Sequence, residues 1–164
     1  MKKLLSTLAV FALLVVSALS FTACGKKEAT LKASDLTGDY ITATVVFTAE
    51  GETESETKTH AEFLEIANPS AEYSKWYPFF SDYRVTAAGK ILEKDVGAPD
   101  SEYAEENAEV ATWEIKDNTL KVTYKEIPAN TTYETVYENG KIVNTVTITG
   151  YGVAVITLEK APAA

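Results

Sequence analysis

The chain has 164 residues, with 24 acidic and 15 basic side chains and a formal net charge of −9 at pH 7. This acidic balance disfavours nucleic acids and anionic membrane surfaces as partners, because both repel negative charge. One cysteine is present, so no disulfide can form within a monomer. A single domain fits the length, and a hydrophobic core must stabilise it.

The first residues have the layout of a secretory signal. Lys2 and Lys3 precede an uncharged, mostly apolar run over residues 4–21, and small residues then lead to Cys24. A run of this length is near the lower limit for crossing a bilayer. We therefore expect a signal peptide over residues 1–23, removed on maturation, rather than a retained transmembrane helix.

The sequence Phe21-Thr22-Ala23-Cys24 resembles the lipobox of bacterial lipoproteins. The resemblance implies that lipid, such as palmitate, is attached to Cys24, which becomes the first residue of the mature protein. An ordinary buried cysteine is the alternative, but the polar stretch that follows would not bury it. We expect a lipid-anchored protein of the cell envelope, on the extracytoplasmic side of a membrane, with a polar tether over residues 24–34.

The folded domain is expected over residues 35–161, and its first strand runs from Tyr40 to Thr48. Apolar and polar residues alternate there with the period of two that is typical of a strand with one buried face. The pattern predicts four inward-facing residues, Ile41, Ala43, Val45 and Phe47.

The region from Thr57 to Tyr77 is the only clear helical segment. Thr59-His60-Ala61-Glu62 has the spacing of a capping box and is followed by apolar residues, which predicts a short helix. Asn68-Pro69 ends that helix, and a second turn carrying Trp76 stops before Pro78.

Three hairpins and a final strand are predicted after this helical insertion. Turn residues at Ala88-Gly89, Asp117-Asn118 and Asn139-Gly140 separate short β-branched and aromatic runs. With the first strand, the count is eight, in up-and-down order. An antiparallel sheet of eight strands can close around side chains or one small ligand, so the sequence predicts an all-β, eight-stranded antiparallel barrel.

Several stretches resemble the bacterial lipocalin-like lipoproteins. They are Leu36-Thr37-Gly38-Asp39-Tyr40 at the first strand, the hairpin over residues 83–90, the hairpin over residues 113–120 and the closing strand at residues 155–158. The resemblance implies a lipocalin-like barrel that is closed at one end. It also implies that the connection between the first two strands lies over the open end.

That connection, residues 49–80, carries an aromatic cluster with two interpretations. The aromatic side chains either form a lid over a ligand or simply plug the barrel or seal its side. If they form a lid, we expect the ligand to contact the first strand and the lid together, at Ile41, Ala43, Val45, Phe47, Trp76 and Phe80.

Little in the sequence points to catalysis. His60 is the only histidine, so neither a Ser-His-Asp set with spare partners nor a His/Cys zinc site has much material. The acidic runs over residues 50–56 and 100–109 lack the loop pattern of a calcium hand. We expect no enzyme activity, no cofactor and no metal.

Two classes of function remain. The first is a monomeric binding protein whose barrel holds a small hydrophobic or amphipathic ligand. The second is a surface or assembly protein with a filled barrel that binds a protein partner. Cavity volume distinguishes them, because ligand pockets measure roughly 300 Å³ or more, whereas packed cores leave only water-sized voids.

Overall fold

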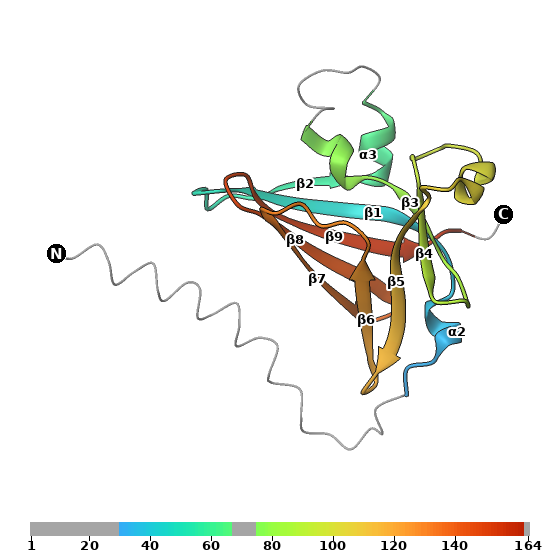
Figure 1. Ribbon diagram of the computed structural model, residues 1–164. Coiled ribbons are helices and arrows are strands. Elements are labelled where there is room, and N and C mark those ends of the chain that lie inside the picture. Colours follow the sequence, from blue (N-terminus) through green and yellow to red (C-terminus); the bar gives the residue numbers. More distant parts are fainter. Residues whose placement is uncertain (1–29, 67–74, 163–164) are drawn as a thin grey trace. The chain divides into compact units, whose positions relative to one another are not determined.

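The structure is a computed structural model that describes residues 30–66 and 75–162 (Figure 1). The expected signal peptide and Cys24 lie outside these residues. The chain forms an antiparallel sheet that curls into a nearly closed barrel. Its strands are β1 (Gly38–Ala49), β2 (Glu56–Thr59), β3 (Asp82–Val85), β4 (Lys90–Lys94), β5 (Glu109–Lys116), β6 (Thr119–Tyr124), β7 (Thr131–Glu138), β8 (Lys141–Ile148) and β9 (Gly152–Lys160).

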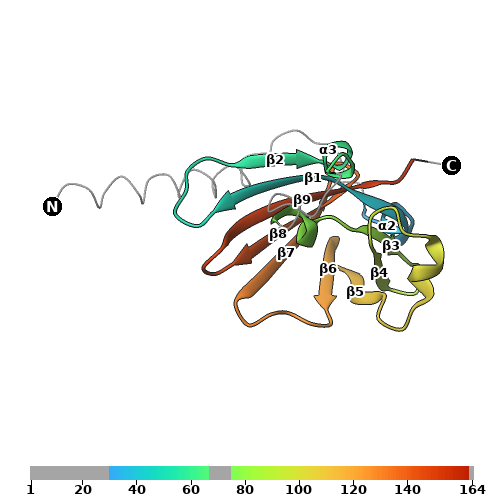
Figure 2. The same cartoon turned by 90° about the horizontal axis from the view of Figure 1, so that it is seen from above.

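The strand order confirms the predicted up-and-down barrel. Eight strands lie in the order β6-β5-β4-β3-β1-β9-β8-β7, and β2 is an extra strand on one half of β1. The first and last strands pair with each other, as in a closing barrel. In the described part of the chain, β6 and β7 are the two ends of this order and do not pair with each other, and Figure 2 shows the gap between them. We call this gap the β6–β7 seam.

Two of the predicted turns show why the hairpins could be predicted from the sequence. Asp117 and Asn118 have φ angles of 52° and 59°, and Asn139 and Gly140 have φ angles of 52° and 80°. Both central residues of each two-residue loop therefore adopt the left-handed conformation that Asn, Asp and Gly tolerate.

A bulge in β1 divides that strand into two halves with opposite alternation. Its register against β9 shifts between Thr42 and Thr44, which leaves Ala43 as the extra residue. An extra residue moves every later side chain to the other face of the sheet. Before the bulge the buried residues are Tyr40 and Thr42, and after it they are Val45 and Phe47.

The prediction for the inward face of β1 is therefore confirmed at Val45 and Phe47 and wrong at Ile41 and Ala43, which are only partly buried. Thr42 is buried in their place. Its hydroxyl donates to the carbonyl oxygen of Ser81 at 2.8 Å, which satisfies a polar group that would otherwise be costly to bury.

One end of the barrel is closed by the short helix α2 (Ala33–Leu36). Leu36 is fully buried, and its carbonyl oxygen accepts a hydrogen bond of 2.7 Å from the Tyr40 hydroxyl. The Tyr137 hydroxyl donates to the carbonyl oxygen of Asp35 at 3.2 Å. Leu31, which lies in the predicted tether over residues 24–34, also packs against the core.

The predicted insertion lies between β1 and β3. It contains β2, the helix α3 (His60–Leu64) and the 3-10 turn η1 (Tyr77–Phe79). The capping box is confirmed, because Thr59 accepts from the backbone N–H of Glu62 and the Glu62 carboxylate accepts from the Thr59 N–H at 2.8 Å. A second 3-10 turn, η2 (Asp100–Ala104), follows β4. All members of the core cluster lie within the compact unit Leu31–Ala164.

Candidate functional site

The barrel interior contains a cavity of about 670 Å³. Its wall is formed by inward-facing residues of the strands from β3 to β9, by Leu36 of α2 and by Phe79 of η1. Most of the lining side chains are apolar. The wall also carries a group of polar side chains, which are Tyr83, Glu93, Tyr124, Tyr133, Thr135 and Asn144.

None of the six residues predicted to contact a ligand lines this cavity. The structure does bring four of them together, because Val45, Phe47, Trp76 and Phe80 all belong to the buried core cluster. Ile41 and Ala43 are not in this cluster, because the bulge in β1 places Tyr40 and Thr42, rather than Ile41 and Ala43, on the buried face before it. The predicted contact of a ligand with these six residues therefore stays a prediction, because none of them lines the cavity.

The aromatic side chains of the insertion pack like a core. The Phe47 ring meets Trp76 edge-on at 6.4 Å and stacks on Phe79 at 5.8 Å, measured between ring centroids. Phe63 stacks on Phe80 at 4.4 Å. Among the described residues of this insertion, only Pro78 and Phe79 line the cavity. This arrangement is the one expected of side chains that plug the barrel or seal its side, rather than of a lid over a ligand.

A chain of hydroxyl groups bridges the β6–β7 seam. The rings of Tyr124 and Tyr133 stack with centroids 4.4 Å apart. The Thr135 hydroxyl donates to Oδ1 of Asn144 at 3.1 Å, so the Tyr124 hydroxyl is the donor in its own contact of 3.0 Å with Thr135 Oγ1. Side chains thus join two strands whose backbones do not pair.

Tyr83 and Glu93 face each other across β3 and β4. The Tyr83 hydroxyl donates to Oε1 of Glu93 at 3.3 Å. Burial is the main cause that raises the pKa of Tyr83, and it also raises the pKa of Tyr124 and of Tyr133. These phenols therefore stay protonated and neutral at physiological pH.

The rim of the cavity is acidic. It includes Glu106 and Glu109 at the start of β5 and Lys125 and Glu126 just after β6. Glu109 lies 2.6 Å from the ammonium of Lys90 and 3.1 Å from that of Lys125, and these contacts lower the pKa of its carboxyl group. The rim lies beside the seam, at the end of the barrel away from α2.

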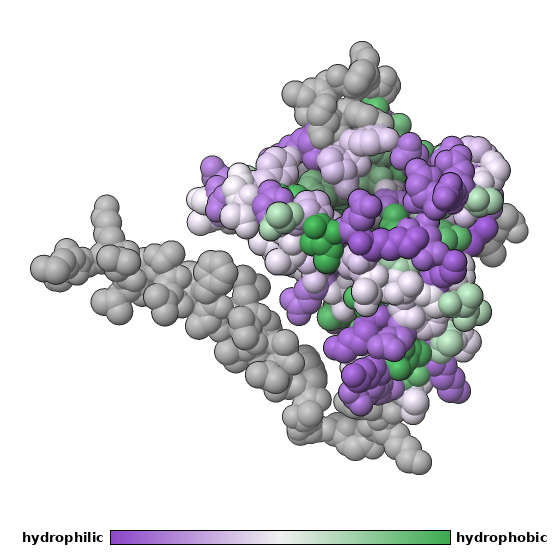
Figure 3. Space-filling view, viewed as in Figure 1, coloured by the Kyte–Doolittle hydropathy of each residue, from purple (hydrophilic) through white to green (hydrophobic). Residues whose placement is uncertain are grey.

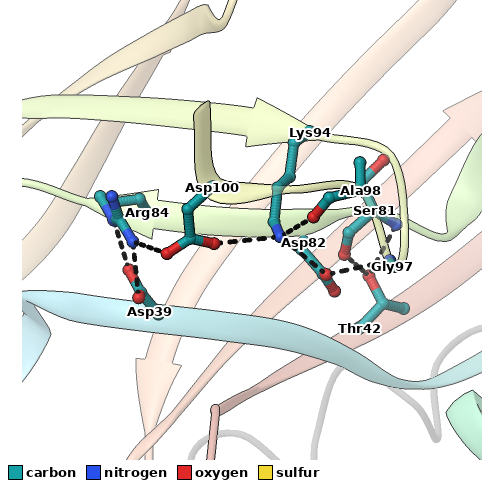
Figure 4. Close-up of polar contacts among 9 residues, drawn as sticks. All are labelled: Asp39, Thr42, Ser81, Asp82, Arg84, Lys94, Gly97, Ala98 and Asp100. Atoms are coloured by element: carbon teal, nitrogen blue, oxygen red, sulfur yellow. Dashed lines mark hydrogen bonds and ion pairs between the residues drawn. The ribbon is translucent and has the colours of Figure 1, made fainter. Parts of the chain in front are cut away.

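A network of charged residues lies on the outer face of β3 and β4 (Figure 4). Arg84 donates two hydrogen bonds to Asp39, at 2.7 and 2.9 Å, and a third to Asp100 at 3.0 Å. Lys94 contacts Asp100 at 3.2 Å and donates to the carbonyl oxygen of Ala98. These bonds hold the segment with η2 against the barrel.

The same network contains a buried oxygen, Asp82 Oδ1, without a hydrogen-bond partner among the described residues. The other oxygen of Asp82 lies 3.8 Å from the Lys94 ammonium and 3.5 Å from the backbone nitrogen of Gly97. In residues 30–66 and 75–162, no three acidic, histidine or cysteine side chains come together in a way that could hold a metal ion. We therefore assign the network to loop attachment.

The remaining surface offers fewer features. On the face in Figure 3 hydrophilic side chains predominate, and apolar ones occur in small separate groups. His60 is half-buried, and its Nδ1 lies 3.1 Å from the carbonyl oxygen of Thr42. Within the described residues, no helix has the length and apolarity needed to cross a bilayer.

Comparison with protein-family models, with curated proteins and with solved structures found no match for this chain.

The cavity residues were missed by the sequence analysis, although one signal was present. In β4 the inward positions are Ile91 and Glu93, and in β6 they are Leu120, Val122 and Tyr124. A charged residue at a position that alternation assigns to an apolar face marks either a strand edge or a polar interior. Glu93 was such a residue.

Proposed function

We propose that this protein binds a small, largely apolar molecule with a polar end inside its barrel. The observation that carries the proposal is the cavity of about 670 Å³. This volume lies within the roughly 300–1,000 Å³ range of ligand sites and far above the voids of a packed core. The alternative function, a surface protein that binds a partner through its outer face, needs only a filled barrel and does not account for this cavity.

The wall fits an amphipathic molecule. Apolar residues such as Val122, Val146 and Ile156 can cover a hydrocarbon body, and the tyrosine hydroxyls and Glu93 can bind a polar end. Ligand pockets commonly combine apolar walls with a few placed polar groups. We propose that the ligand enters beside the β6–β7 seam, where the rim residues lie, rather than through the aromatic insertion.

We also propose that the domain acts at a membrane of the cell envelope, anchored through lipid on Cys24. The support is the signal-like segment and the lipobox resemblance. Cys24→Ser should release the protein from the membrane fraction or leave it uncleaved, because no other residue offers a thiol. A fully cleaved Cys24→Ser protein that still fractionates with membranes would contradict the anchor.

The binding proposal is tested by filling the cavity. Residues 30–164, which contain the whole core cluster, are titrated with the uncharged fluorescent probe N-phenyl-1-naphthylamine. Val122→Trp places a large ring in the cavity and should weaken probe binding by about tenfold or more. Thr123→Trp is the matched control, since Thr123 is exposed on the outer face of the same strand.

Thermal midpoints of both variants show whether they fold. Equal probe affinities for the two folded variants, or a wild-type protein that binds no apolar probe, would overturn the proposed ligand cavity.

A further inference from the structure

Glu93 is an acidic side chain in the wall of a mainly apolar cavity. Its one side-chain hydrogen bond among the described residues comes from the Tyr83 hydroxyl, at 3.3 Å. None of the ion pairs among those residues includes Glu93. A carboxylate offers about four acceptor positions, so the described residues leave most of its hydrogen-bonding capacity unused.

The other charged groups in the wall reinforce this negative character. The lining includes four glutamates, Glu93, Glu106, Glu109 and Glu126, but Lys125 is its one basic residue within the described chain. Lys125 is already held by Glu109 at 3.1 Å. The cavity therefore lacks a cation that could neutralise Glu93, and an anionic ligand would meet repulsion.

Three aromatic rings surround this part of the cavity. Tyr83, Tyr124 and Tyr133 all line it, and the face of a tyrosine ring attracts cations. Burial is the largest cause that raises the pKa of each of these phenols, and the negative charge of Glu93 is a further cause. The Glu93 carboxylate is thus close enough to all three hydroxyl groups to interact with them electrostatically.

We infer that the ligand is an amphipathic organic cation whose ammonium group pairs with Glu93 among Tyr83, Tyr124 and Tyr133 while its hydrocarbon body occupies the apolar remainder of the cavity. This inference rests on the proposed ligand cavity and names the chemical class of its occupant. Glu93 is only partly buried, and a ligand ammonium would pair with its carboxylate in surroundings less polar than water.

The test compares three molecules with the same ten-carbon chain: decylammonium, decanol and decanoate. Each displaces N-phenyl-1-naphthylamine from residues 30–164 below its micellar concentration. Decylammonium should bind at least about tenfold more tightly than decanol, and decanoate should bind most weakly. A wild-type protein that binds decanol as tightly as decylammonium would overturn the cationic ligand and leave the cavity proposal standing.

Variants then assign the charge preference to Glu93. Glu93→Gln keeps the size of the side chain and should reduce the ammonium-over-alcohol ratio by about tenfold, with decanol affinity little changed. Glu114→Gln removes the same charge from the exposed face of neighbouring β5 and should keep the wild-type ratio. Equal losses in the two variants would mean that overall charge, not Glu93, sets the preference, which overturns the inference.

If Glu93→Gln does not fold, Tyr83→Phe provides a second test. It removes the hydroxyl that donates to Glu93, so the carboxylate gains more from a ligand ammonium and the ratio should rise. An unchanged or lower ratio would contradict the pairing. If neither the probe nor any of the three molecules binds the wild-type protein, the ligand cavity itself fails, and this inference fails with it.

Discussion

Two regions of the barrel interior contain aromatic clusters, and they differ in what the rings do. Around β1 and the insertion, Phe47 contacts both Trp76 and Phe79, and all three side chains are buried. Around β3, β6 and β7, Tyr83, Tyr124 and Tyr133 surround a cavity. We call these regions the packed side and the hollow side.

The hydroxyl group explains part of this difference. A buried phenylalanine needs only apolar neighbours, whereas a buried tyrosine also needs a hydrogen-bond partner. On the hollow side Tyr124 finds its partner in Thr135, and Tyr83 finds its partner in Glu93. These polar pairs hold side chains along the wall instead of letting them fill the centre.

Strand length explains another part. β3 and β4 have four and five residues, whereas β1 has 12. The second half of β1 pairs with β9 on one edge but extends beyond β3 on the other, and β2 with the insertion occupies that open edge. An insertion that replaces a missing wall must pack as core, which is why its aromatic rings are buried.

The largest expected effect tests the packed side. Trp76→Ala removes a side chain that is 1% exposed and should cost about 3–5 kcal/mol of unfolding free energy, lowering the thermal midpoint by roughly 10 °C or more. Tyr77→Ala is the matched control, because the neighbouring ring is 44% exposed. A nearly unchanged midpoint together with lost probe binding would identify Trp76 as part of a lid instead.

A second effect concerns pH and the closed end. Burial, with smaller contributions from Tyr137 and Asp35, raises the pKa of Tyr40 from 10.0 to about 12. The folded state favours the protonated phenol, so this stabilisation is complete below pH 10 and is lost as the pH rises towards 12. A difference of about two pH units corresponds to about 2–3 kcal/mol.

Denaturant unfolding at pH 9 and pH 11 measures this loss. Tyr40→Phe should be less stable than wild type at pH 9, because it lacks the bond to Leu36, but should lose less stability between the two pH values. Equal losses in both proteins would contradict the assignment. The other buried tyrosines contribute to the alkaline loss in both proteins and cancel in the comparison.

The smallest effect tests the hollow side. Thr135→Val removes the hydroxyl that links Tyr124 to Asn144 across the seam and should cost about 1 kcal/mol of unfolding free energy. Thr123→Val, at an exposed position, should change stability little.

Because the seam has no backbone pairing, we also expect faster amide exchange in β6 and β7 than in β9. Slower exchange in β6 than in β9 would show that the seam is not the weak point.

Features that depend on neighbouring residues were predictable from the sequence. The capping box at Thr59 and Glu62 and the turns at Asp117-Asn118 and Asn139-Gly140 are satisfied by atoms a few positions away. The eight-strand order followed from the spacing of these local signals.

The bulge at Ala43 depended instead on distant partners. It arises where β1 pairs with β9 and where Thr42 bonds to Ser81, 39 positions later in the chain. The cavity likewise depends on the side chains of seven strands together, and its polar wall combines Glu93 of β4 with tyrosines of β3, β6 and β7. Alternation within one strand predicts which residues share a face, but only the pairing of all the strands decides which face turns inward and how much space is left between them.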